Sequence, residues 1–372
     1  MYISYSTIIT INVSLIFFLL LLLPLLNSRY CLKHLSSGCL VAFFIIIMIR
    51  ALFPTEFSFA KTIRSTHVMV SIRNILHYKL YPAGYETSLL QLLFFIWITG
   101  AVFLLARKLY HYIRLVHLIE KMPDAKNEML LNTWERVKAK HPGIQNIRLV
   151  EINQNVSPFI IGLKKPIIVM PVYPFSQTEY EFILEHEIQH ALRHDSVLKL
   201  LADILCTVYW WNPLFYLLKK KTFDYIEIGN DKRLIAFMSD AQKNAYMECL
   251  VHTAQKINGR QFGFVLSFNK SDYRTLKKRL ELIGNYSGPA KRWVNLPVFL
   301  ILLLLLCLST SFTLEPYSLF DDYIVLNQNN SYIIQRDGIY EIYYNGIFIE
   351  EADSLEYYNE QIPVYEADAI SE

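Results

Sequence analysis

The sequence contains little charge for its length. Aspartate, glutamate, lysine and arginine make up only 19% of the 372 residues, whereas hydrophobic residues make up 53%. Soluble domains usually contain about a quarter of charged residues, so this balance argues against an ordinary soluble protein and favours a membrane protein. The formal net charge of +3 is too small to indicate a nucleic-acid-binding surface, and we expect no direct contact with nucleic acid.

Motifs built on cysteine and glycine are also missing. The five cysteines form no Cys-x-x-Cys pair, so the sequence indicates neither a disulfide framework nor a thiol-zinc site. No glycine-rich phosphate loop is present, which argues against nucleotide chemistry. Chemistry based on histidine and carboxylate side chains therefore remains to be considered.

Four apolar runs are long enough to cross a bilayer as helices, at residues 8–26, 35–53, 89–106 and 294–314. No lysine or arginine precedes the first run and no small-residue cleavage site follows it, so we expect a retained helix rather than a signal peptide. The runs predict an α+β membrane protein with four transmembrane helices. Its parts are a membrane domain at residues 1–114 with three of these helices, a mainly helical soluble domain with a small β-sheet at 115–290, the fourth helix, and a tail at 315–372.

The distribution of charge predicts the orientation. Basic residues flank the apolar runs at 29–33, 107–121 and 291–292, and the positive-inside rule places such flanks in the cytoplasm. The tail holds thirteen acidic residues, a single basic one, Arg336, and no lysine. We therefore expect a multi-pass protein of the plasma membrane with its N-terminus and β-rich tail outside and its soluble domain in the cytoplasm.

Local patterns predict further elements. We expect helices at 127–141, 241–258 and 273–283, strands at 147–152 and 167–170, and a tail hairpin around Asn345-Gly346. Residues 196–218 predict one buried or membrane-abutting helix that ends near a surface at Lys219-Lys220-Lys221. Within the loop at 54–88, residues 65–78 could form an amphipathic helix on the membrane or belong to an exposed loop, and the sequence leaves both alternatives open.

The stretch His186-Glu187-Ile188-Gln189-His190 carries the chemistry. Residues four apart lie on one face of a helix, so both imidazoles can bind one zinc ion. Glu187 sits where a carboxylate can act as general base on water. Downstream, Glu227 can complete a His2Glu ligand set, and Asp231, one helical turn further, can orient an imidazole. The alternative is that these side chains form a solvated helix face.

Further blocks carry a family resemblance. They are Ser157-Pro158-Phe159 with Gly162 and the stretch up to Pro171, Asp195 after the second histidine, Trp210-Trp211-Asn212-Pro213-Leu214, and Glu227 with Asp231. Together they resemble the membrane-embedded antirepressor metallopeptidases of the BlaR/MecR type. One departure is Asn230, where the family often has cysteine.

The resemblance implies a zincin-like (gluzincin) cytoplasmic domain in a bacterial membrane. In it His186, His190 and Glu227 would hold zinc, and Asp195 and Asp231 would support these ligands from behind. It implies a protein substrate, either a small winged-helix repressor or the chain itself, and leaves a homodimer open. The strand near Ile160–Met170 would then bind the substrate backbone by edge pairing.

The tail is shorter than the family's penicillin-binding domain and has no lysine, so we do not expect direct β-lactam sensing. Two alternatives remain. One is a housekeeping membrane protease of the CAAX-processing or heat-shock type, which shares H-E-x-x-H and E-x-x-x-D. The other is a non-catalytic membrane receptor or scaffold that retains the fold.

Overall fold

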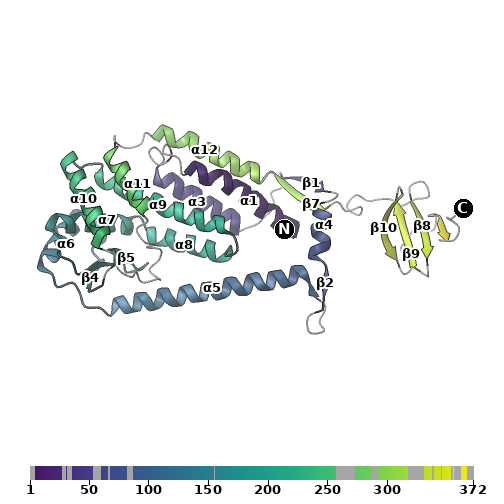
Figure 1. Cartoon of the computed structure of the whole chain (residues 1–372), viewed down its shortest axis with the longest axis horizontal. Helices are drawn as coiled ribbons and strands as arrows, with labels where there is room; N and C mark the ends of the chain where they lie inside the picture. Colours follow the sequence, from purple (N-terminus) through teal and green to yellow (C-terminus); the bar gives the residue numbers. More distant parts are fainter. Residues whose placement is uncertain are drawn as a thin grey trace. The chain divides into compact units, whose positions relative to one another are not determined.

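A computed structural model gives the fold (Figure 1). It describes residues 5–26, 31, 36–52, 60–65, 68–81, 87–154, 156–256, 273–286, 288, 292–316, 331–336, 339–344, 346–352, 355 and 362–366. The chain divides into two units: one comprises Met1–Ile63 and Ile75–Leu314, and the other Arg64–Asn74 and Glu315–Glu372.

The chain is a mostly helical α+β protein with small sheets. The helices are α1 (Tyr5–Leu26), α3 (Ser37–Leu52), α4 (Val68–Leu76), α5 (Leu89–Glu120), α6 (Glu128–Lys140), α7 (Gln177–Leu192), α8 (Asp195–Val208), α9 (Pro213–Ile235), α10 (Asp240–Lys256), α11 (Tyr273–Gly284) and α12 (Arg292–Ser309). The strands are β1 (Lys61–Ser65), β2 (Lys79–Leu80), β3 (Thr87–Ser88), β4 (Arg148–Ile152), β5 (Phe159–Ile161), β6 (Ile167–Pro171), β7 (Phe312–Pro316), β8 (Ser331–Arg336), β9 (Ile339–Tyr344), β10 (Ile347–Ala352) and β11 (Val364–Glu366).

Two helices among the described residues are long and apolar enough to cross a membrane by length and composition, at Ser6–Leu26 and Leu89–Glu120. The other two predicted spans are less extended. α3 has 16 residues, and α12 ends at Ser309, after which the chain enters β7. The helix expected up to residue 314 is therefore too long, because apolar composition does not separate the end of a helix from an apolar strand.

The first apolar core joins the apolar helices α1, α3 and α12 to α8 and α9. It contains buried side chains of α1, α3, α8, α9 and α12, including Leu19, Ile47, Leu205, Phe215 and Leu306. Two long-range hydrogen bonds tie the same elements together: the Tyr209 hydroxyl donates to the Ala51 carbonyl at 2.7 Å, and that of Tyr225 donates to the Leu26 carbonyl at 2.8 Å. This core fixes α9 against the N-terminal helices.

A three-stranded sheet has the strand order β4-β6-β5. β4 is parallel and β5 antiparallel to β6, and every residue of β6 is buried. One face packs on α6 and α7 through Ile168 and Met170, and the other on the end of α5 through Val169. β6 reads as a continuous apolar run because both of its faces are covered. The strands expected at 147–152 and 167–170 are confirmed.

The prediction of one helix over 196–218 is wrong. The chain leaves α8 at Val208 and starts α9 at Pro213, and the Asn212 side chain accepts a hydrogen bond from the Leu214 N–H at 3.0 Å. Asparagine at the N-cap followed by proline is a strong helix start signal, which the surrounding apolar residues concealed. α9 then continues to Ile235, so Lys219-Lys220-Lys221 lies within a helix and does not end one.

The second unit contains the tail sheet, in the order β10-β9-β8-β11. β9 and β10 are antiparallel with Tyr344 opposite Ile347, so the chain reverses at the predicted hairpin, where Gly346 has a φ of +78°. Ile333, Ile342 and Ile362 form its small core. α4 lies within the predicted range 65–78 and confirms that a helix forms there.

Candidate metal centre

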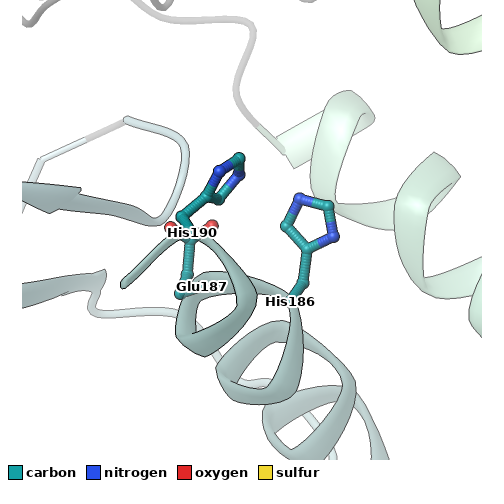
Figure 2. A group of neighbouring side chains, drawn as sticks. All are labelled: His186, Glu187 and His190. Atoms are coloured by element: carbon teal, nitrogen blue, oxygen red, sulfur yellow. The ribbon is translucent and has the colours of Figure 1, made fainter. Parts of the chain in front are cut away.

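α7 places the two histidines of the motif on one face. Ser176 caps the helix by accepting from the Glu179 N–H, and the Glu179 side chain accepts from the Ser176 N–H in return, which forms a capping box. His186, Glu187 and His190 are all buried, and potential ligand atoms of the three lie within 4.8 Å of one another. Figure 2 shows both imidazole rings projecting from the same side of the helix.

α9 brings Glu227 to these rings. The Nε2 atom of His186 lies 3.2 Å from Oε2 of Glu227, and the Nε2 atom of His190 lies 3.4 Å from Oε1 of the same carboxylate. The structure therefore brings together the three side chains that the sequence predicted as a His2Glu set. Lys199 on α8 lies 3.7 Å from Oε1 of Glu227, a neighbour that the sequence did not predict.

The other nitrogen of His190 is held by Asp195. Nδ1 of His190 lies 2.8 Å from Oδ2 of Asp195, and the Asn230 amide donates to the same oxygen at 2.9 Å. Asp195 begins α8 directly after exposed His194, whose φ of +54° is left-handed and lets the chain turn sharply between α7 and α8. Asn230 thus supports the carboxylate that orients a histidine and is not placed as a ligand.

His186 is oriented by a larger network. Its Nδ1 atom lies 3.0 Å from the Tyr246 hydroxyl, which donates to Oδ1 of Asp231 at 2.7 Å. Oδ1 of Asp231 itself lies 3.4 Å from the same Nδ1. Arg279 binds both oxygens of Asp231, with Nε at 2.6 Å and Nη2 at 2.7 Å. Asp231 therefore lies beside His186, as the sequence predicted, but reaches it chiefly through Tyr246.

Opposite charges dominate the electrostatics of the centre. Burial opposes the charged form of His186, but hydrogen bonds to Asp231 and Glu227 outweigh it and raise its pKa to about 9. Burial and Lys199 likewise oppose charging of His190, and Glu227 outweighs them, so the pKa of His190 is also raised. Burial would raise the pKa of Glu227, but the histidines and Lys199 hold it well below its ordinary value.

The residues fit a divalent metal. Both Nδ1 atoms have hydrogen-bond partners on their far sides, which leaves both Nε2 atoms facing Glu227 as the ones that can bind a metal. Among the described residues, Nε2 of His190 and Oε2 of Glu187 are buried atoms without a hydrogen-bond partner. Buried polar atoms rarely stay unpaired, and two imidazoles with a carboxylate form a catalytic zinc ligand set.

The strand expected to bind a substrate backbone is only partly placed for that role. β6 is the central strand, so its backbone is occupied on both sides and the part of the prediction that falls on Ile167–Met170 is wrong. β5 is an edge strand of this sheet and contacts α7, which carries the histidines. The strand at the edge of this sheet beside α7 is therefore β5, and pairing of a peptide with the residues near Ile160 stays a prediction.

Sequence reasoning missed Tyr246, Arg279 and Lys199. Tyr246 and Arg279 come from α10 and α11, far along the chain from the motif, and no spacing rule connects them to it. Arg279 follows Lys277 and Lys278 and resembles part of a solvated basic face. The burial of Lys199 depends on the packing of α8 against α9, which the sequence does not specify.

Comparison with known proteins identifies the family. Residues 13–283 match the family described as BlaR1 peptidase M56. The chain is 25% identical over 195 residues to the regulatory protein BlaR1 of Bacillus licheniformis, covering 52% of this chain and 32% of that one. It is 25% identical over 279 residues to the methicillin resistance mecR1 protein of Staphylococcus aureus (strain Mu50 / ATCC 700699), covering 70% of this chain and 46% of that one. The chain thus spans less than half the length of these relatives. The match over most of its length shows that the chain belongs to the BlaR1 peptidase M56 family.

Proposed function

We propose that the protein is a membrane zinc endopeptidase of the antirepressor type. The observation that carries this proposal is the convergence of both Nε2 atoms of His186 and His190 on the carboxylate of Glu227, at 3.2 and 3.4 Å. Membership of a peptidase family supports hydrolysis of peptide bonds as the reaction. The buried, oriented ligand set argues against a non-catalytic scaffold.

In this proposal zinc, held by His186, His190 and Glu227, supplies Lewis acidity to a water molecule and to the peptide carbonyl. Glu187 accepts the proton of that water and passes it to the leaving amine. Its Oε2 atom is buried beside the histidines and lacks a partner among the described residues, so it is available for this role. β5 pairs with the substrate backbone and holds the scissile bond over the centre.

The same proposal assigns a signalling role. The names of the relatives, a regulatory protein and a methicillin resistance protein, support a chain that converts an external stimulus into proteolysis. The substrate would be a cytoplasmic transcriptional repressor, such as a small winged-helix protein, or the chain itself. The four apolar segments would cross the plasma membrane, with the centre on the cytoplasmic side and the N-terminus and tail outside.

Two substitutions test the roles within the centre. We expect the purified parent protein to contain about one zinc ion per chain. The His186→Ala variant should lose this ion, because the two remaining ligands hold zinc poorly. The Glu187→Gln variant should keep zinc and lose proteolysis, measured as fragments of the chain or of a co-expressed winged-helix repressor. Full proteolysis by the Glu187→Gln variant would contradict the general-base role.

A further inference from the structure

Three carboxylates lie in a row on the face of α9 that carries Glu227. Asp224, Glu227 and Asp231 are spaced three and four residues apart, which places them on one side of a helix. α11 packs on α9 and meets the start of this row with polar side chains. Thr275 Oγ1 donates to Oδ1 of Asp224 at 3.0 Å, and Lys278 Nζ lies 3.9 Å from its Oδ2. Complementary polar groups therefore set the position of α11 on α9.

Arg279 extends this contact into the centre. Its Nε and Nη2 donate to the two oxygens of Asp231 at 2.6 and 2.7 Å, and its Nη1 lies 3.6 Å from Oε2 of Glu227. The planar guanidinium matches a carboxylate with two parallel hydrogen bonds, a geometry that lysine does not reproduce. Arg279 therefore holds both oxygens of Asp231 in place and lies beside the proposed third ligand.

The direction of the hydrogen bonds connects Arg279 to the imidazole. Both oxygens of Asp231 accept hydrogen bonds from the Arg279 guanidinium, and a carboxylate in such a bidentate pair acts as an acceptor. The single proton of the Tyr246 hydroxyl therefore goes to Asp231, at 2.7 Å. The hydroxyl oxygen must then accept from Nδ1–H of His186, 3.0 Å away. This leaves Nε2 of His186 as the atom that can bind a metal.

We propose that Arg279 and Tyr246 are positioning residues of the metal centre and that the docking of α11 on α9 is a condition for tight zinc binding. Arg279 holds both oxygens of Asp231 in place, and Tyr246 passes this constraint to His186. The inference rests on the proposed function, because it takes the metal to be zinc held by His186, His190 and Glu227. A buried Arg–Asp pair could also serve only to anchor α11, and the experiment separates these two roles.

The test uses the full-length chain purified in detergent, with zinc affinity measured by competition with a chromophoric chelator. The Arg279→Met and Tyr246→Phe variants should bind zinc about 10–100-fold more weakly, the usual loss when a partner of a ligand is removed. The zinc affinity of the Arg279→Lys variant should lie between the affinities of these variants and of the parent, because lysine keeps the charge but cannot form the two parallel hydrogen bonds. The visible absorption spectrum of the cobalt-loaded Tyr246→Phe variant should also shift, since the His186 ring is no longer held.

Lys277→Met is the matched control. Lys277 lies on the same helix, is 61% exposed and pairs with Glu281 of α11 at 4.0 Å, so its loss should leave zinc affinity unchanged. If Arg279→Met does not fold because Asp231 is left buried and unpaired, the double variant Arg279→Met/Asp231→Asn removes that charge and should fold yet bind zinc weakly.

Parental zinc affinity and an unchanged cobalt spectrum in both the folded double variant and Tyr246→Phe would overturn the inference and reduce the network to a structural anchor. A parent chain that binds no zinc would instead overturn the proposed function together with the inference, so the two failures are distinguishable.

Discussion

At the scale of single residues, the histidines of the centre take part in two competing equilibria. Without metal, hydrogen bonds to carboxylates favour the protonated form of His186 and raise its pKa to about 9. Zinc needs the unprotonated Nε2 of the same ring. In the proposed zinc site, protons and zinc would therefore compete for one atom, Nε2 of His186, across the physiological pH range.

This competition predicts opposite pH dependences for zinc binding and for the stability of the metal-free protein. Zinc affinity should rise at least tenfold per pH unit up to about pH 9, because binding displaces at least one proton. The stabilisation of the metal-free fold by protonated His186 should be complete below its ordinary pKa of 6.5 and be lost as pH rises through about 9. Chelator competition and thermal unfolding from pH 6 to 10 measure the two trends. A zinc affinity that does not change over this pH range would contradict the competition between protons and zinc for His186.

The side chains predicted from local spacing are the ones that the structure brings together. His186, His190 and Glu187 share one helix, and Glu227 and Asp231 share another, so the 3.6-residue period alone groups each set. Tyr246 and Arg279 could not be predicted in this way. Their contacts depend on how α10 and α11 pack on α7 and α9, and this packing is a tertiary property that no local pattern encodes.

At the scale of elements, the connection between α8 and α9 is locked to α5 by two tryptophans. Trp97 Nε1 donates to the Val208 carbonyl at 2.7 Å, and Trp210 Nε1 donates to the Trp97 carbonyl at 3.4 Å. Gly100 leaves room for the indole of Trp210, since a Cβ at this position would lie 3.0–3.2 Å from three of its ring atoms. The break between α8 and α9 thus holds α5 against α8.

The Gly100→Ala substitution should therefore destabilise the protein. Alanine is favoured over glycine in a helix by about 1 kcal/mol, but displacing the half-buried indole of Trp210 costs about 1–3 kcal/mol. The second effect is larger, and we expect a lower midpoint of thermal unfolding in detergent.

Gly38→Ala is the matched control for this substitution. It makes the same change in α3, where an added Cβ has nothing within 4 Å, so it should leave the midpoint equal to or above that of the parent. Equal midpoints for both variants would show that Trp210 can move aside without cost.

Element boundaries were less predictable than element types. α5 continues past the expected end at Ala106 to Glu120, because a helix tolerates Arg107 and Lys108 where a membrane span would stop. The end of α12 was missed for a related reason. Hydropathy measures the preference of a side chain for apolar surroundings over water, and it does not distinguish a helix from a strand. The N-cap at Asn212 shows the opposite case, a local signal present in the sequence but hidden within an apolar run.

At the scale of the whole molecule, the proposed topology predicts where thiol reagents can reach. Glu135 on α6 has a side chain 71% exposed, and Glu366 on β11 is also exposed. In intact cells a membrane-impermeant maleimide should label the Glu366→Cys variant and spare the Glu135→Cys variant, relative to the parent with its native cysteines. After the membrane is permeabilised, both variants should react. If only the Glu135→Cys variant is labelled in intact cells, the orientation in the membrane is opposite to the proposed one.

The pairing of the ligands with charged neighbours also determines how the protein responds to loss of metal. The pKa values of His186 and His190 are both raised without metal, while Lys199 and Arg279 lie 3.7 and 3.6 Å from Glu227. Two protons on the imidazoles carry the same charge as one zinc ion. If each imidazole takes up one proton when zinc leaves, the exchange conserves the net charge of the buried centre.

A charge-conserving exchange makes the metal separable from the fold. In small zinc domains the metal supplies the folding energy and chelators unfold the chain. Here, treatment with a chelator at pH 7 should abolish proteolysis but leave the helical circular dichroism unchanged, and added zinc should restore activity without refolding. Unfolding on chelation would show that the protons do not replace the charge of the metal. In the proposed peptidase the centre would then be a reversible exchange site, and the concentration of free zinc and the local pH together would set the fraction of active protein.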